Sequence, residues 1–174
     1  LYFREAAPAA ASRDMYLDEA GELIPSMSLY THSAAGVPGS VAGMEAAHRR
    51  FGTLPWERLI EPAIRLARDG FRVERRHHDD LASARDRLAR YPATAAALLP
   101  VGAAPVVGSI QRQPDLARTL EAIAERGAAG FYHGWVADSI EAEMRAEELK
   151  EPLRNFQKDI KTTVDDLRTG VESG

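Results

Sequence analysis

The chain has 174 residues, of which 45% are hydrophobic, and a formal net charge of -4. This length suits one domain, and the modest negative charge gives no basis for binding nucleic acid or an anionic membrane. The sequence contains no cysteine, which excludes disulfides, thiolate nucleophiles and thiolate metal sites. No apolar run approaches the roughly 18 residues of a membrane span, so we expect no membrane segment in this piece.

No signal-like segment follows Leu1, and we interpret the chain as a piece of a longer protein. Alanine is abundant and aromatic residues make up only 7%. Because alanine has the highest helix propensity, the predicted fold class is mainly α, with sparse strand confined to the first 37 residues. Apolar residues at helical spacing, bounded by proline and glycine, predict six helices. These are Pro38–Phe51, Leu54–Asp69, Asp79–Arg90, Pro114–Arg126, Trp135–Lys150 and Pro152–Leu167.

Shorter features are predicted between and within these helices. Leu1–Phe3 is typical of the end of a strand, and Leu29–Thr31 also has strand character. Ala9–Tyr16 is compatible with a short helix, and Gly108–Gln111 with a short extended piece. Pro62 falls inside the second predicted helix, where its missing N–H predicts a kink or a break into two helices.

Two groups of histidine and acidic residues were candidates for chemistry. His48 lies on the apolar stripe of the first predicted helix, and we interpret it as a packed or rim-exposed side chain. His77 and Asp80 have the three-residue spacing that helical metal ligands prefer, but two candidates do not make a site. We interpret residues 77–80 as the solvated start of a helix, and we predict no metal site.

Four sequence blocks together resemble the large subunit of the gamma-glutamyltransferase (glutathione hydrolase) family. They occur in the family's order, which is specific, whereas any one of them alone would be weak. The resemblance runs from Phe3 to Met144 and implies the helical portion of an N-terminal-nucleophile hydrolase, whose layers are αββα. The four blocks are REAAP from Arg4, GVPGSVAGM from Gly36, FGTLPWERLIEPAIRLARDGF from Phe51 and QPDLARTLEAIAERGAAGFYHG from Gln113.

The resemblance also implies an activity. Enzymes of this family transfer the γ-glutamyl group of glutathione and related amides to water or to an amino acid. Their nucleophile is a threonine that becomes N-terminal by self-cleavage, so that its own amine acts as the base. Neither Thr31 nor the pair Thr162 and Thr163 has the required position or flanking residues, so we expect no catalytic residue in this chain.

The implied partners are a γ-glutamyl substrate such as glutathione and a small catalytic subunit that this chain lacks. No cofactor is expected. Similarity to bacterial members implies a periplasmic or secreted protein.

Arg4 is the candidate substrate-binding residue. The residues alone favour an exposed charged pair with Glu5 at the end of a strand. A guanidinium group, however, presents a planar fork of donors that binds a carboxylate in bidentate fashion. The resemblance implies that Arg4 holds the α-carboxylate of the glutamyl group.

The end of the chain departs from the family pattern. We therefore divide the chain into a large-subunit fragment, residues 1–146, and an amphipathic helical tail, residues 147–174. Two alternatives to the glutathione hydrolase interpretation stay open: a non-catalytic helical scaffold or interaction module, and an amide acylase of the same fold. The apolar residues that define the tail recur at spacings of three and four: Leu153, Phe156, Ile160, Val164 and Leu167.

Overall fold

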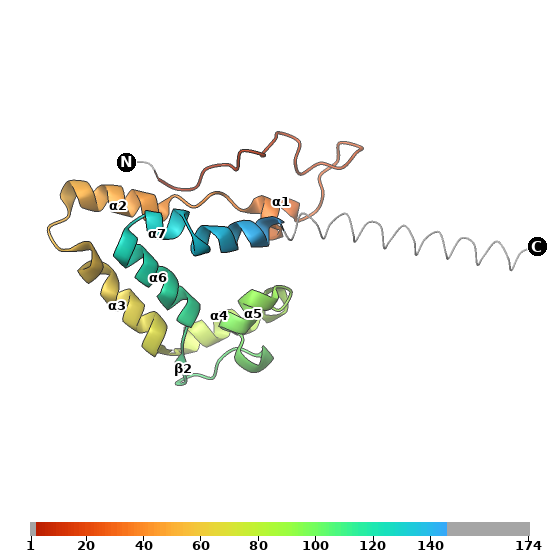
Figure 1. The fold of residues 1–174 in the computed structure, drawn as a ribbon. Helices are drawn as coiled ribbons and strands as arrows, with labels where there is room; N and C mark the ends of the chain where they lie inside the picture. The colour runs from red at the N-terminus through yellow and green to blue at the C-terminus, as the bar shows by residue number, and fades with distance from the viewer. Residues whose placement is uncertain (1–2, 146–174) are drawn as a thin grey trace, which may run out of the picture. The chain divides into compact units, whose positions relative to one another are not determined.

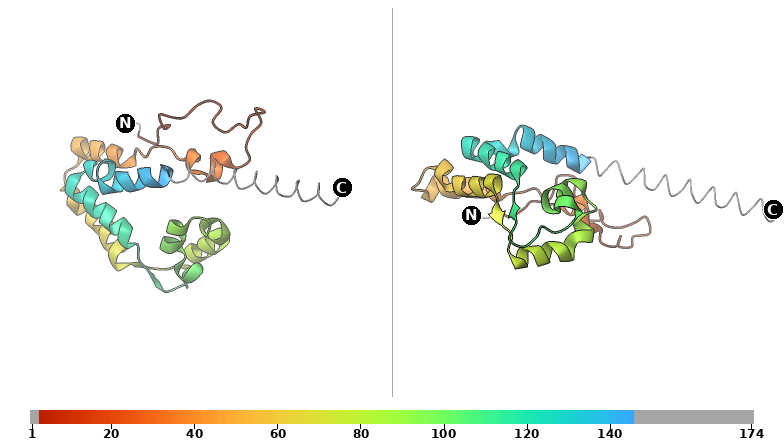
Figure 2. Two further views of the ribbon diagram at one scale, coloured as in Figure 1. Left: turned by 45° about the vertical axis from the view of Figure 1, so that its right-hand side comes forward. Right: turned by 90° about the horizontal axis from the view of Figure 1, so that it is seen from below.

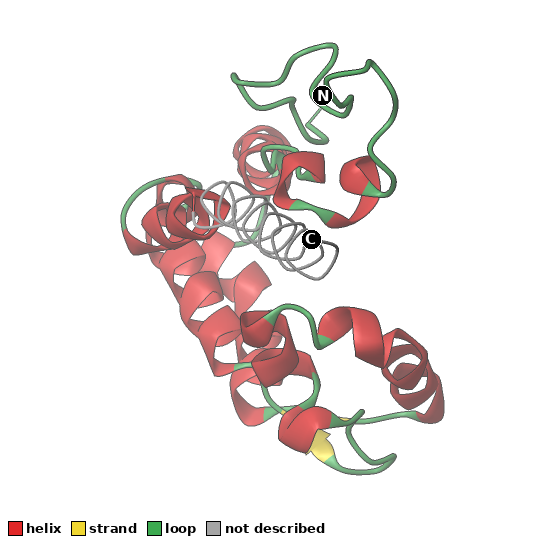
Figure 3. Cartoon of the chain, turned by 90° about the vertical axis from the view of Figure 1, so that its right-hand side faces the viewer, coloured by secondary structure: helices red, strands yellow, loops and turns green. Residues whose placement is uncertain are grey.

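A computed structural model describes residues 3–145 of the chain. Helices dominate this part, and regular strand is limited to two short segments (Figure 3), which confirms the mainly α class. The chain divides into two compact units, each described here by itself. The described residues of the first unit are 3–43 and 132–145, and the second unit comprises residues 44–131.

The first unit is built on loops and short helices. Two isolated antiparallel bridges, Ala6 with Val37 and Leu17 with Leu23, join its loop segments. Val41 and Val136 are its buried apolar side chains among the described residues. Its helical elements are α1 (Met27–Tyr30), η1 (His32–Ala34), the first turn of α2 (Ser40–Phe51) and a helix that begins at Trp135 and continues to Arg145, the last described residue.

The strand predicted at Leu29–Thr31 is wrong, because these residues belong to α1 and the turn after it. The Thr31 hydroxyl donates to the carbonyl of Met27 at 2.6 Å, so this carbonyl has a local hydrogen-bond partner. Strand-favouring side chains form a strand only where a neighbour is available for pairing. The short helix predicted at Ala9–Tyr16 is also absent and is replaced by turns, while Leu1 and Tyr2 lie outside the described residues.

The second unit is organised by a pair of helices, α3 (Trp56–Asp69) and α6 (Pro114–Arg126), which run side by side (Figures 1 and 2). At one end of the pair, the indole Nε1 of Trp56 donates to the carbonyl of Ile123 at 2.9 Å. Further along, Arg68 forms an ion pair with Glu121, and the hydrogen bond to that carboxylate raises the pKa of the Arg68 guanidinium. The buried side chains of the two helices are small or β-branched: Ile64, Ala67, Ala117, Ala122, Ile123 and Ala124.

Pro62 lies inside a continuous α3, so the predicted break into two helices does not occur, and the alternative, a kink, stays a prediction. Proline at this position removes the hydrogen bond that would reach the carbonyl of Arg58, one turn earlier. Both residues are exposed, so water can satisfy that carbonyl. The buried side of α3, which carries Ile64 and Ala67, is unaffected.

A two-stranded antiparallel sheet follows α3. Strand β1 (Phe71–Arg72) pairs with β2 (Ile110–Gln111), with Phe71 opposite Gln111 and Arg72 opposite Ile110. The extended piece predicted at Gly108–Gln111 is thus confirmed in its second half. The prediction that strand is confined to the first 37 residues is wrong, because each two-residue strand carries no periodicity of its own and forms through its partner.

Besides α2 from Met44 on, the remaining helical elements of the second unit are α4 (Arg75–Leu88), α5 (Pro92–Leu98), the short turn η2 (Pro100–Gly102) and α7 (Ala129–Tyr132), whose last residue belongs to the first unit. Helix α4 begins four residues before its predicted start at Asp79, because Arg75 and Arg76 are good helix formers even without an apolar pattern. The bounds of α6 coincide with the prediction. The end of the helix predicted at Trp135–Lys150, and all of Pro152–Leu167, lie outside the described residues.

Residues 3–145 contain no helix with both the length and the apolar character needed to cross a bilayer.

The turn between α6 and α7 is fixed by polar and close contacts. The Glu45 carboxylate accepts the N–H of Ala128 at 3.0 Å. Gly130 lies so close to α6 that a Cβ there would overlap the carbonyl oxygen of Ala122.

Replacing Gly130 by alanine tests this close contact. In a free helix the substitution would stabilise by about 1 kcal/mol, because alanine has the better propensity. Here the added methyl meets backbone, so we expect a net loss of about 1–3 kcal/mol in the free energy of unfolding, typical of overpacking. Urea denaturation of the chain measures it. The control, Ser83→Ala on exposed helix α4, should stay within about 0.5 kcal/mol of the parent, and a stabilising Gly130→Ala would contradict the contact.

Candidate functional site

The segment that carries Arg4 is held against the start of α2 by main-chain hydrogen bonds. The N–H of Ala6 donates to the carbonyl of Val37 at 3.1 Å, and the N–H of Val37 donates back to the carbonyl of Ala6 at 2.8 Å. These two bonds form the isolated antiparallel bridge between Ala6 and Val37. The bridge fixes the chain two residues after Arg4.

Glycines in the GVPGSVAG stretch let the two segments approach closely, because they carry no side chain that would project towards residues 3–5. A Cβ at Gly39 would overlap the carbonyl oxygens of both Phe3 and Arg4, and a Cβ at Gly43 would overlap the Phe3 ring. A Cβ at Gly36 would come within 2.7 Å of the Cβ of Glu5. The backbone before and after Arg4 therefore lies directly on α2 and on the residues that precede it.

The Arg4 side chain leaves this fixed backbone and is 76% exposed. Its guanidinium forms an ion pair with Glu5 at 3.2 Å, and the Glu5 side chain is itself 53% exposed. An exposed pair of neighbouring residues contributes little to stability. A ligand carboxylate that accepts two parallel N–H bonds can therefore replace Glu5 at low cost. The structure thus shows the exposed charged pair that the residues alone favoured, and the binding of a carboxylate by Arg4 stays a prediction.

Tyr132 fixes the α2 side of this arrangement. Its hydroxyl donates to the carbonyl of Pro38 at 2.7 Å and accepts the N–H of Ala42 at 3.4 Å. The hydroxyl thereby joins the residue before Gly39 to the first turn of α2. Nothing in the sequence signalled this pairing, because Tyr132 lies 90 positions from Ala42 and 94 from Pro38.

His48 is packed, as predicted. Its Nε2 lies 2.8 Å from the carbonyl oxygen of Leu54, and its ring centroid lies 5.2 Å from that of Trp56. These contacts hold the end of α2 to the start of α3, so the His48 ring has a structural role.

The histidines of α4 differ from the prediction of a solvated helix start. His77 and His78 lie inside α4 and are half-buried. The Nε2 of His77 lies 2.7 Å from the Oε1 of Gln111, and the Nδ1 of His78 lies 2.9 Å from the carbonyl oxygen of Pro105. The His77 ring therefore anchors α4 to β2, and the His78 ring anchors it to the loop that leads into β2. In the part of the chain that the structure describes, no three histidine or acidic residues gather in a way that could hold a metal ion.

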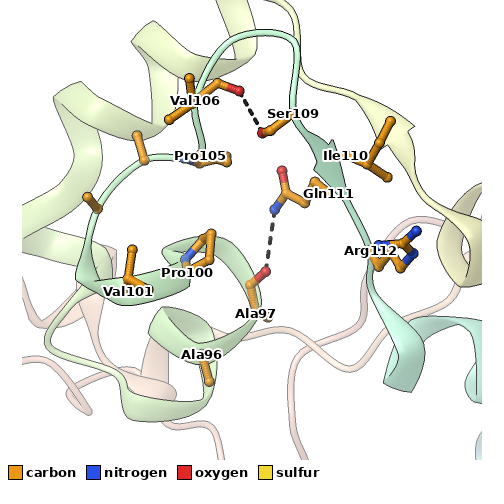
Figure 4. A pocket seen from close by; sticks show the side chains of 12 residues that line it. Ala96, Ala97, Pro100, Val101, Pro105, Val106, Ser109, Ile110, Gln111 and Arg112 are labelled. Atoms are coloured by element: carbon orange, nitrogen blue, oxygen red, sulfur yellow. Dashed lines mark hydrogen bonds between the residues drawn. The ribbon is translucent and has the colours of Figure 1, made fainter.

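A hollow of about 410 Å³ lies between α5, η2 and β2 in the second unit (Figure 4). Alanine, proline and valine side chains form most of its wall. Gln111 extends into it, but the Gln111 amide donates to the carbonyl of Ala97 at 3.4 Å, and the Ser109 hydroxyl donates to that of Val106 at 2.6 Å. These polar groups hold the loop, and the residues that line the hollow include no acid or histidine. Arg4 on its backbone support is therefore the stronger candidate.

Comparison with known proteins decides the family. The family model described as gamma-glutamyltranspeptidase matches residues 1–168. This chain belongs to the gamma-glutamyltranspeptidase family. A relative from Pseudomonas aeruginosa named glutathione hydrolase proenzyme is 43% identical over 152 residues, which cover 83% of this chain and 25% of the relative.

Solved structures of gamma-glutamyltranspeptidases and related enzymes share the fold. The gamma-glutamyltranspeptidase of Helicobacter pylori is 40% identical with a TM-score of 0.82, and the match covers 84% of this chain and 42% of that one. A cephalosporin acylase from Bacillus halodurans is 32% identical with a TM-score of 0.62, over 70% of this chain and 23% of that one. These matches confirm the prediction of a helical portion of an N-terminal-nucleophile hydrolase.

The chain spans about a quarter of the length of the curated gamma-glutamyltranspeptidase relatives that it matches. The family match runs past residue 146. The boundary placed there, and the separate tail of residues 147–174, stay predictions.

The exposure of the Arg4–Glu5 pair has a measurable consequence. Replacing Glu5 by glutamine removes the negative charge of the pair but keeps the size of the side chain. Because exposed pairs contribute little, we expect the free energy of unfolding to change by less than about 0.5 kcal/mol. Urea denaturation at low and at high salt measures it. A loss above about 1 kcal/mol at low salt would mean that Glu5 locks the Arg4 guanidinium in place.

Proposed function

We propose that this chain contributes the substrate-binding arginine of a glutathione hydrolase, an enzyme that acts on glutathione and related γ-glutamyl amides. The observation that carries the proposal is the geometry of Arg4. Its guanidinium is exposed, while its backbone rests on glycines and is followed by the bridge between Ala6 and Val37. The names of the curated relatives, which are glutathione hydrolases, support the same activity.

In this proposal Arg4 binds the α-carboxylate of the γ-glutamyl group. Two parallel N–H···O bonds orient the planar carboxylate as well as attract its charge. The ligand carboxylate takes the place of Glu5, whose pairing with Arg4 is exposed to water. The amide to be cleaved lies at the other end of the glutamyl group, so a fixed Arg4 sets where that carbonyl is presented.

The attack on the amide is assigned to a threonine outside this chain. Its hydroxyl adds to the γ-carbonyl while its own α-amine takes the proton. That proton then passes to the amide nitrogen, which departs as an amine and leaves an acyl-enzyme. Water or an amino acid then displaces the threonine oxygen. Three groups among the described residues that could compete for this role are engaged in structure: Thr31 donates to Met27, and the rings of His48 and His78 bond to backbone carbonyls. A small catalytic subunit is accordingly the proposed partner.

The similarity to a cephalosporin acylase favours a second candidate, an amide acylase of the same fold. The two candidates differ in what Arg4 does, because only a glutamyl substrate offers an α-carboxylate to the guanidinium. Activity of the full-length protein towards γ-glutamyl amides and towards other acyl amides separates them. Preference for an acyl group without an α-carboxylate would favour the acylase.

The 174-residue chain alone should not hydrolyse γ-glutamyl-p-nitroanilide. Covalent catalysis needs a nucleophile with a base in hydrogen-bond reach, and the proposal places both on the absent threonine. Release of p-nitroaniline by the purified chain measures it, with the full-length protein as positive control. Turnover that co-purifies with the chain would overturn the assignment of the nucleophile.

In the full-length protein, Arg4→Lys should weaken the binding of γ-glutamyl substrates. Lysine keeps the charge and loses the planar fork, so a cost of roughly 1.5–3 kcal/mol is expected for this charge-assisted contact. The cost corresponds to at least about a tenfold rise in KM with little change in kcat, provided the contact is equally strong in the ground and transition states. Steady-state kinetics with γ-glutamyl-p-nitroanilide measures both constants. Parent-like KM in this variant would remove Arg4 from the substrate site.

A further inference from the structure

We infer that Tyr132 is a positioning residue for Arg4: its hydroxyl fixes the short segment of residues 37–39 on which the arginine's backbone rests. The inference depends on the proposed function in one respect, that Arg4 binds the substrate carboxylate. The two residues do not touch through their side chains. Tyr132 acts through the main chain between them.

The Tyr132 hydroxyl is the first link. It donates to the carbonyl of Pro38 and accepts the N–H of Ala42, at 2.7 and 3.4 Å. The Ala42 N–H belongs to the first turn of α2, where backbone donors have no partner within the helix. The Tyr132 hydroxyl thus pairs with both the N–H of Ala42 in the helix and the carbonyl of Pro38 in the loop. It thereby fixes the distance between the loop and the helix.

The loop itself is the second link. Val37, Pro38 and Gly39 are consecutive, and each has a different task. Val37 makes both hydrogen bonds of the bridge to Ala6, Pro38 receives the Tyr132 hydroxyl, and Gly39 is in close contact with the carbonyls of Phe3 and Arg4. A shift of Pro38 therefore moves both surfaces that place Arg4.

The consequence concerns geometry rather than charge. Loss of the hydroxyl leaves Arg4 present, exposed and charged, but it removes one restraint on where its Cα lies. Bidentate binding depends on the position of the fork, and misplacement by about 1 Å is enough to reduce catalytic efficiency substantially. We therefore expect Tyr132→Phe to weaken the binding of a substrate in proportion to how much that binding depends on Arg4.

The chain offers a matched control in Tyr16. Its hydroxyl donates to the carbonyl of Ser33 at 3.0 Å, and like Tyr132 it is half-buried in the first unit. This bond holds the loop at η1 and does not involve residues 36–39. Tyr16→Phe removes the same group and the same kind of hydrogen bond, so it reports the general effect of losing a tyrosine hydroxyl.

The first measurement is hydrogen exchange in the full-length protein, followed by mass spectrometry of peptides that contain Ala6 or Val37. Tyr132→Phe should raise their exchange rate about three- to tenfold, the range expected for one net hydrogen bond. Tyr16→Phe should leave them unchanged. An unchanged rate in Tyr132→Phe, or an equal rise in both variants, would overturn the coupling.

The second measurement compares γ-glutamyl-p-nitroanilide with 4-aminobutanoyl-p-nitroanilide, which lacks only the α-carboxylate. For Tyr132→Phe we expect a rise in KM of about three- to tenfold for the first substrate, with little change in kcat, and parent-like kcat/KM for the second. Equal losses on both substrates would show a merely structural role. In the double variant with Arg4→Lys, the effect of Tyr132→Phe should vanish, since the hydroxyl acts through the arginine.

The two proposals fail in different ways. If Arg4→Lys leaves the preference for the carboxylate-bearing substrate intact, the proposed function is wrong, whatever the exchange data show. If Arg4→Lys abolishes that preference and Tyr132→Phe does not alter it, the role of Tyr132 alone is wrong. Gly39→Ala is an independent second variant: its methyl meets the Phe3 and Arg4 carbonyls, so it should reproduce the substrate-selective rise in KM while keeping the Tyr132 hydroxyl.

Discussion

Direct contact between main chains is the constraint on which the candidate site depends. The segment Phe3–Ala6 contains no regular secondary structure beyond one bridge, and its side chains are exposed. It is held because Gly39 and Gly43 present bare backbone to it and because Val37 completes two hydrogen bonds with Ala6. An alanine in place of either glycine would require the segment to move. The backbone of the arginine is therefore fixed while its charged group stays exposed. Burying that charge would be costly.

The second unit shows the same preference for close backbone approach, achieved with alanine as well as glycine. Helices α3 and α6 bury Ala67, Ala117 and Ala124 along their length, and Trp56 closes one end through its bond to Ile123. Small side chains let helix axes come close, and these alanines serve that approach. The histidines that first suggested chemistry belong to this framework: they tie helix ends and loops to their neighbours.

Local patterns predicted the helices well and the long-range contacts poorly. The bounds of α6 follow from Pro114 at its start and Gly127 after its end, both of which act within one turn. In contrast, β1 and β2 are two residues each and exist only through pairing across the intervening α4 and α5, which no local pattern encodes. Leu29–Thr31 failed for the complementary reason, since its side chains favour strand but no partner strand is there to pair with it.

For the site, the residue with the most distinctive chemistry, Arg4, could be proposed from its motif, whereas the group that supports it, Tyr132, could not. Its role depends on a hydroxyl placed by the fold against residues distant in sequence.

The bridge between Ala6 and Val37 has a consequence for how this part of the protein can change over time. Its two hydrogen bonds use N–H and C=O groups, which every residue except proline supplies. The residues after Arg4 are thus free to exchange their side chains without displacing the arginine, whereas Gly39 and Gly43 tolerate no such exchange. The determinants of the arginine's location lie in another segment of the chain, at positions distinguished by the side chain that they lack.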